Sequence, residues 1–165
     1  MLNRTSKHSP THHFHIARST YLAALIGHHA IVLHLLKDSS WTTSPDRSVW
    51  GRLFRAAAVN GHVETVKILL ADYDNVQACV DPQPQLRLLG CRPLLFGERH
   101  IMAAIHGDRE DTLKILLNFI DDQPQFWAIR GEILDCALRT VAYYQGTRKE
   151  CERLLRERCA KLAGE

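Results

Sequence analysis

The chain has 165 residues, of which 45% are hydrophobic and 24% are charged, and its formal net charge is +3. This length suits one compact domain and is short for two. So mild a charge, with no run of five like charges, does not indicate a nucleic-acid or membrane partner. The five cysteines form no CxxC pair, which favours reduced thiols over a disulfide framework or a zinc knuckle.

Residues 1–15 are expected to form a flexible tail in which histidines cluster at positions 8, 12, 13 and 15. Without a fixed scaffold, this tract predicts no metal site. The tail lacks the apolar core of a secretory signal, and its lack of acidic residues is only weakly compatible with an organellar transit peptide. We therefore expect an intracellular protein, cytoplasmic or nuclear rather than organellar.

Four segments of the chain repeat one pattern: two small residues, a short spacer, a glycine, then an apolar stretch ending in two leucines. The first runs from Ala23 and Ala24 through Gly27 to Leu36, and its longest apolar stretch is shorter than the ~20 residues of a membrane span. The others have Ala57, Ala58 and Gly61; Ala103, Ala104 and Gly107; and, loosely, Val141, Ala142 and Gly146. Such repetition predicts a stack of helical hairpins in which no hairpin buries its apolar face alone.

Gly27 and Gly61 are 34 residues apart, and with the stretch Glu64 to Leu70 this spacing resembles the ankyrin repeat family. The resemblance implies an all-α, ankyrin-like helical-hairpin solenoid, forming a single domain over residues 16–163. Its repeats are expected at about 16–38, 48–71, 98–120 and 132–163, with a long inserted loop at 71–97. No repeat has the family's Thr-Pro-Leu-His opening: Arg52-Leu53-Phe54-Arg55 stands there in the second, with Arg99-His100-Ile101-Met102 nearby in the third.

The glycines at 27, 61, 107 and 146 are predicted to end each first helix in the left-handed backbone conformation. His28 and His62 follow two of these glycines and match the family's turn histidine, so a structural role is expected. The paired leucines lie one residue farther from Gly107 than from Gly61, which predicts a longer turn around residues 108–110. The alanine pairs should let neighbouring hairpins pack closely, and Trp50 is expected in the core.

Three segments distinguish one part of the stack from another. The proline- and glycine-rich insertion 71–97 is predicted to be an ordered finger folded onto the stack. The last helix, residues 148–162, is mostly charged and is expected to be a C-terminal cap. The first repeat is apolar nearly all round, so we expect an exposed patch, or a cover formed by residues 8–18, by self-association, by another chain or by a longer stack.

The resemblance implies a protein–protein interaction scaffold that binds its partner on the concave face formed by first helices and loops. No cofactor is expected. Arginines near the first helices form a basic stripe, for which we favour an acidic protein over nucleic acid: Arg52, Arg55, Arg99, Arg130 and Arg139. The residues expected at the binding face are Arg52, Arg55, Val59, Asn60, Ile105, His106, Tyr143, Tyr144 and Gln145.

The alternative is a small-molecule-binding protein or an acid–base enzyme of the isomerase, cyclase or lyase type. If the 71–97 insertion covers the first helices, it would close a pocket containing His100, His106 and Tyr144. The sequence has no nucleotide-binding glycine motif, hydrolase elbow or paired metal carboxylates, which argues against the common enzyme classes. The two functions differ structurally: a closed cavity with His100 or His106 beside a carboxylate would favour the enzyme or small-molecule binder, whereas an open concave groove would favour the scaffold.

Overall fold

The computed structural model describes residues 10–37, 47–73 and 97–164, and every regular element within them is helical. The all-α class is therefore confirmed for the described residues. The predicted insertion 71–97 lies mostly outside those residues. The helices are α1 (Pro10–Ile26), α2 (His29–Leu36), α4 (Arg47–Asn60), α5 (Val63–Ala71), α8 (Glu98–His106), α9 (Glu110–Asp122), η1 (Pro124–Phe126), α10 (Arg130–Tyr143) and α11 (Lys149–Ala163).

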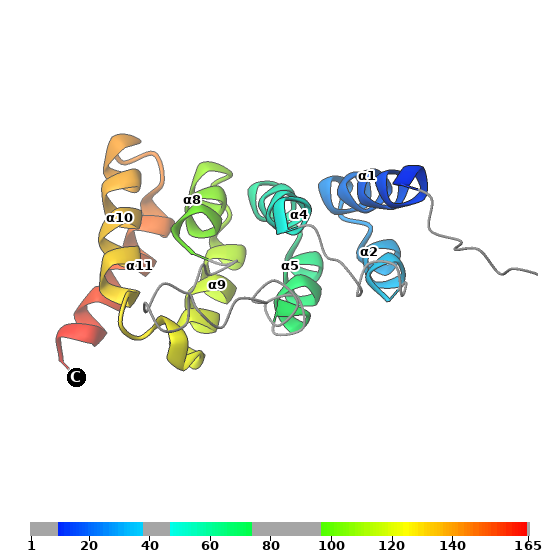
Figure 1. Cartoon of the computed structure of the whole chain (residues 1–165). Helices are drawn as coiled ribbons and strands as arrows, with labels where there is room; N and C mark the ends of the chain where they lie inside the picture. Colours follow the sequence, from blue (N-terminus) through cyan, green and yellow to red (C-terminus); the bar gives the residue numbers. More distant parts are fainter. Residues whose placement is uncertain (1–9, 38–46, 74–96, 165) are drawn as a thin grey trace, which may run out of the picture.

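The α-helices form four pairs arranged in two layers (Figure 1). The first helices contact one another in the order α1, α4, α8 and α10, and the second helices do so in the order α2, α5, α9 and α11. Each first helix also contacts the second helix of its own pair. Every inner pair thus buries apolar surface on both sides, as expected when no pair is stable alone.

Each pair turns on a residue with positive φ, which we call the turn residue. Gly27, Gly61 and Gly146 have φ of 79°, 76° and 78°, as predicted from their position after the first helix. The prediction for Gly107 is wrong, because its φ is −78° and Asp108 takes the left-handed conformation at 54°. The third turn spans residues 107–109 where the first two have only two residues, so the expected longer turn is confirmed.

Gly107 has a different role from the other turn glycines. A Cβ atom built on it would lie 1.9 Å from the carbonyl oxygen of Val59, so glycine lets α8 approach the backbone of α4. The shift of the turn to Asp108 also restores a common register. Counted from the turn residues 27, 61, 108 and 146, the paired leucines come eight and nine residues later in all four pairs.

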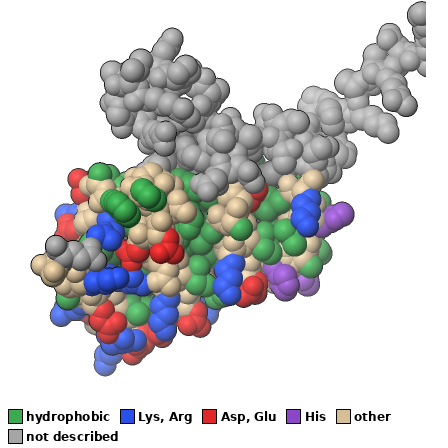
Figure 2. All heavy atoms as spheres, turned by 90° about the horizontal axis from the view of Figure 1, so that it is seen from below, with side chains coloured by type: hydrophobic (Ala, Val, Ile, Leu, Met, Phe, Trp, Pro, Cys, Tyr) green, Lys and Arg blue, Asp and Glu red, His purple; other side chains and the backbone are tan. Residues whose placement is uncertain are grey.

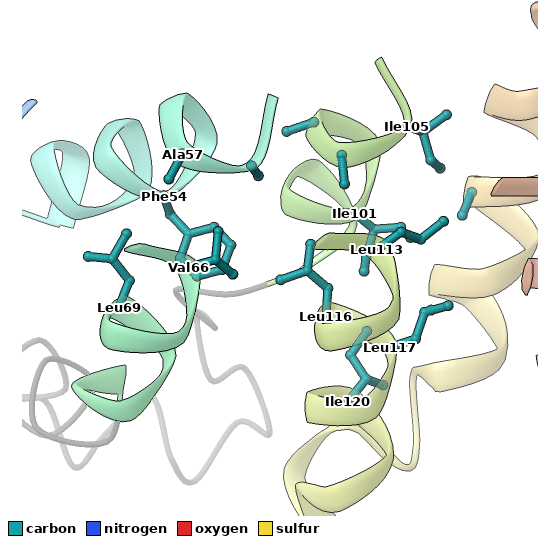
Figure 3. Packing of buried hydrophobic residues seen from close by; sticks show 14 of the residues in the cluster. Phe54, Ala57, Val66, Leu69, Ile101, Ile105, Leu113, Leu116, Leu117 and Ile120 are labelled. Carbon is teal, nitrogen blue, oxygen red and sulfur yellow. The ribbon is translucent and has the colours of Figure 1, made fainter. Parts of the chain in front are cut away.

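The core runs along the whole stack between the two layers. Ala57, Ala58 and Ala104 are fully buried where first helices meet, which confirms that the alanine pairs permit close packing. Val66 and Leu69 of α5 and Leu113 and Leu116 of α9 point into the same interior (Figure 3). Trp50 is fully buried, as predicted.

The two ends of the stack differ in polarity. In α11, Arg153 pairs with Glu150 and Glu157 at 2.9 and 2.7 Å, and Arg156 pairs with Glu152 at 2.6 Å. These pairs leave a charged outer surface, as expected of a terminal cap. From the side of the second helices, histidines gather at the α2 end, whereas acidic and basic side chains mix towards the other end (Figure 2).

The first helix begins at Pro10, inside the tail that was predicted for residues 1–15. Residues 10–15 belong to α1 rather than to a flexible segment, and Pro10 occupies the first helical position, where its fixed φ and missing N–H are well tolerated. The apolar patch expected on the first pair is present: the exposed fractions of Leu22, Ile26 and Ile31 are 48%, 60% and 48%.

Candidate protein-binding face

Equivalent residues of the first helices α8 and α10 lie side by side. Thr140 and Met102 both stand six residues before their turn residue, and the Thr140 hydroxyl lies 3.3 Å from the Met102 sulfur. His106 and Tyr144 both stand two residues before theirs, and their ring centroids are 5.8 Å apart. Positions nine, six and two before the turn residue share one side of a helix. We call this surface the first-helix face.

The turns are joined to one another by side chains that reach back to the preceding pair. His62 Nε2 donates to the Leu25 carbonyl at 2.9 Å, Arg109 Nε to that of Val59 at 3.2 Å, and Arg148 Nη2 to that of His106 at 3.1 Å. Each acceptor stands two residues before its turn residue. These bonds satisfy carbonyls at the ends of first helices that lack a helical partner. The structural role predicted for His62 is confirmed. The sequence did not predict that His62, Arg109 and Arg148 form equivalent bonds between turns.

Most residues predicted for the binding face are accessible. Val59 and Tyr144 are half-buried, and the exposed set comprises Arg52, Arg55, Asn60, His106, Tyr143 and Gln145. Ile105 is an error of the prediction, because its side chain is fully buried (Figure 3). Its place was counted from Gly107, whereas counting from Asp108 makes it equivalent to the buried Ala24 and Ala58.

An aromatic and charged cluster lies at the turn of the fourth pair. The Arg148 guanidinium sits 5.0 Å from the centre of the Tyr144 ring and pairs with Asp108 at 3.2 Å. Tyr143 is 5.7 Å from Tyr144, ring to ring, and 82% of it is exposed. Contacts of a cation with an aromatic face hold such side chains in place. The cluster therefore presents an ordered tyrosine and arginine, residue types that dominate binding at protein interfaces.

The residues of the alternative catalytic site are not all brought together. His100 lies in the first turn of α8, whereas His106 is the last residue of that helix and contacts Tyr144. The His100 ring packs against Phe54 and Trp50, at 4.8 and 5.9 Å, and its Nδ1 accepts a hydrogen bond from the Gly97 amide. Burial lowers the pKa of His100 to about 4, so the imidazole is neutral at physiological pH.

The basic stripe predicted from the sequence is only partly preserved. Arg139 pairs with Asp135 at 2.9 Å, and Arg130 pairs with Asp121 at 3.5 Å, so both take part in ion pairs of the fourth pair and its linker. Arg52, Arg55 and Arg99 are exposed on α4 and α8. Arg18 of α1, which the sequence analysis missed, occupies the position equivalent to Arg52. Arg18 could have been found from the sequence, because it stands nine residues before Gly27, as Arg52 stands nine residues before Gly61.

Other chemistry is sparse in the part of the chain that the structure describes. There, no three histidine, cysteine or acidic side chains are grouped to hold a metal ion, and Cys136, Cys151 and Cys159 form no disulfide. Burial raises the pKa of Cys151 to about 11, so this thiol stays protonated. Over residues 10–37, 47–73 and 97–164, no helix is long and apolar enough to span a bilayer.

Comparisons with protein-family models, with curated proteins and with solved structures found no match to this chain.

Proposed function

We propose that the chain is an ankyrin-like solenoid that acts as an intracellular protein–protein interaction scaffold. The observation that carries the proposal is the alignment of equivalent side chains across the first-helix face. His106 lies against Tyr144, and Met102 against Thr140, so the face is continuous from α8 to α10. In ankyrin-like stacks the corresponding face is concave. A partner crossing it would meet exposed arginines on α4 and tyrosines at the end of α10.

The scaffold is favoured over the acid–base enzyme by the placement of the histidines. An acid–base pair must reach one substrate from both sides within hydrogen-bond distance. His100 and His106 instead lie at opposite ends of α8, and His100 Nδ1 already accepts a bond from the helix start. The insertion 71–97 that would close the pocket lies mostly outside the described residues.

Affinity capture from cell extract with matched variants tests the proposal. Arg55→Glu and Tyr144→Ala alter the first-helix face, while Lys67→Glu makes the same charge reversal as Arg55→Glu on the second-helix layer. We expect the two face variants to lose the proteins that wild type captures and the control to retain them. Circular dichroism would establish that all three remain folded. Capture of unchanged partners by both face variants would contradict the proposal.

We also propose that a second copy covers the outer side of the first pair. Leu22 stands where Ala56 and Ala103 are buried in the next two pairs, and Ile31 stands where Thr65 and Thr112 are buried. Gly107, which lies four residues after Ala103 on the same side of α8, touches the backbone of the preceding pair. In the second and third pairs, the side equivalent to the one exposed on α1 and α2 packs against a neighbouring helical hairpin.

The charge of the opposite end decides how two copies would meet. The outer surface of α11 is lined by ion pairs and is therefore charged, unlike the apolar side of the first pair. Head-to-tail growth is therefore disfavoured, and contact between the two α1–α2 sides would bury apolar surface on both chains. Such a twofold arrangement is the commonest form of homodimer.

A further inference from the structure

Three aromatic rings lie side by side where the first-helix face reaches the fourth pair. The His106 and Tyr144 rings are 5.8 Å apart at an interplanar angle of 70°, and the Tyr144 and Tyr143 rings are 5.7 Å apart at 84°. We call these three side chains the ring cluster. Because both neighbouring pairs are close to perpendicular, the cluster presents the face of one ring beside the edge of the next.

The ring cluster is accessible from outside the stack. His106 is exposed, Tyr144 is half-buried, and 82% of Tyr143 is exposed. Tyr143 stands three residues before its turn residue, at the position where Ala58 and Ile105 are fully buried in the second and third pairs. Because α10 belongs to the last pair of the described stack, this ring is exposed at the end of the first-helix layer.

The side chains around the cluster hold it in place without offering a spare charge. The Arg148 guanidinium lies 5.0 Å from the centre of the Tyr144 ring and pairs with Asp108 at 3.2 Å. One helical turn before the rings, the Thr140 hydroxyl lies 3.3 Å from the Met102 sulfur, which joins α10 to α8 through uncharged side chains. The rings therefore rest on side chains that are either uncharged or paired with the opposite charge.

A proline-rich segment in the polyproline II conformation suits such a surface. Prolines of such segments dock between aromatic side chains, and the segment is already ordered before it binds. Its backbone carbonyls make no internal hydrogen bonds and can accept them from tyrosine hydroxyls. Because neighbouring ring centroids are 5.8 and 5.7 Å apart, the cluster can extend over little more than one turn of this conformation, ~9 Å. The site would therefore take about four residues.

Resting on the proposed function, we infer that the ring cluster binds a short proline-rich protein segment in the polyproline II conformation. An acidic segment or a single-stranded nucleic acid would need cations that are free to bind it. Beside the cluster, Arg148 is paired with Asp108, and Arg139 is paired with Asp135. An amphipathic helix would need an apolar groove, whereas each ring of the cluster carries a polar group.

Fluorescence anisotropy with a short labelled oligoproline tests the inference. Its control is the peptide made of D-proline, which has the same composition and forms the mirror-image helix. Tyr143→Ala and His106→Ala each remove one exposed ring of the cluster. The matched variant Tyr21→Ala removes an exposed tyrosine from α1, at the other end of the first-helix layer. Urea unfolding would establish that all three variants remain folded.

We expect Tyr143→Ala and His106→Ala each to weaken binding of the L-peptide by about three- to tenfold, since each removes one aromatic contact. Tyr21→Ala should change it by less than about twofold, and the D-peptide should bind more weakly to wild type.

Four results would each overturn the inference: equal weakening by Tyr21→Ala, equal binding of both peptides, no binding of the L-peptide to wild type, or tighter binding of an oligoglutamate or oligothymidine at the ring cluster. If Arg55→Glu and Tyr144→Ala still lose the proteins that wild type captures in that event, the proposed function stands without the inference.

Discussion

Replacing single glycines with alanine tests how the helix pairs are aligned with one another. Three glycines are compared, because they differ in backbone conformation and in the space around the Cβ position. Gly146 has a φ of 78° and an open space at its Cβ position. The left-handed conformation costs alanine about 1–2 kcal/mol, and stiffening of the unfolded chain returns about 0.4–1 kcal/mol. We therefore expect Gly146→Ala to lower the free energy of unfolding by about 1 kcal/mol.

Gly107→Ala should cost more although its φ of −78° suits any residue. Its Cβ would stand 1.9 Å from the Val59 oxygen, a backbone atom that cannot rotate away. The α8 helix must then move away from α4 by about 1 Å, and overpacking of this kind costs typically 1–3 kcal/mol, occasionally more. We expect a loss of about 3 kcal/mol. The control is Gly131→Ala, at an exposed position of α10 with nothing near its Cβ, which should gain about 0.5–1 kcal/mol.

Urea unfolding followed by circular dichroism measures all three variants on one scale. The midpoint should fall most for Gly107→Ala, less for Gly146→Ala, and rise for Gly131→Ala. A Gly107→Ala protein as stable as wild type, or no less stable than Gly146→Ala, would refute the close approach of α8 to α4 and the register built on it.

Three further predictions concern the turns, the aromatic core and the first pair. His62→Ala and Arg109→Ala should each lower the free energy of unfolding by about 1 kcal/mol, since each removes a bond between turns; unchanged urea midpoints would contradict this. Because the pKa of His100 is lowered to about 4, the unfolded chain binds a proton at this histidine at a higher pH than the folded chain does. The free energy of unfolding should therefore fall by about 3 kcal/mol as the pH is lowered from about 6.5 to about 4. His100→Gln should flatten this part of the stability–pH curve, and a slope equal to that of wild type would be the wrong result. In sedimentation equilibrium, Leu22→Glu with Ile31→Glu should abolish a concentration-dependent dimer, and a wild-type protein that stays monomeric at every concentration would exclude the contact.

The helices and most turns could be predicted from sequence because their signals are local. Apolar periodicity and glycines at 27, 61 and 146 report the backbone directly. The third turn could not be predicted in the same way. Gly107 is required by its close approach to Val59, a residue of another helix that is distant in sequence, and not by the conformation of its own turn. The sequence alone does not show whether a glycine is required by a positive φ or by a close contact with another helix.

That one error propagated into the predicted binding face. Counted back from Gly107, the ninth residue is Glu98 and the second is Ile105; counted from Asp108, they are Arg99 and His106. The first count places a buried isoleucine at the surface and puts Glu98 at the position that Arg18 and Arg52 occupy in the first two pairs. The bonds from His62, Arg109 and Arg148 were equally hidden, since histidine and arginine share no sequence pattern and their acceptors are backbone carbonyls of another pair.

The central claim, that the first-helix face is the binding surface, is tested most directly by backbone amide hydrogen exchange of the protein, measured alone and with a partner that the wild-type chain captures from cell extract. We predict that the partner slows exchange most on α4, α8 and α10, around Arg55, His106 and Tyr144, and changes it little on the second helices α5 and α9. Slowing concentrated on the second-helix layer, or spread evenly over both layers, would contradict the claim.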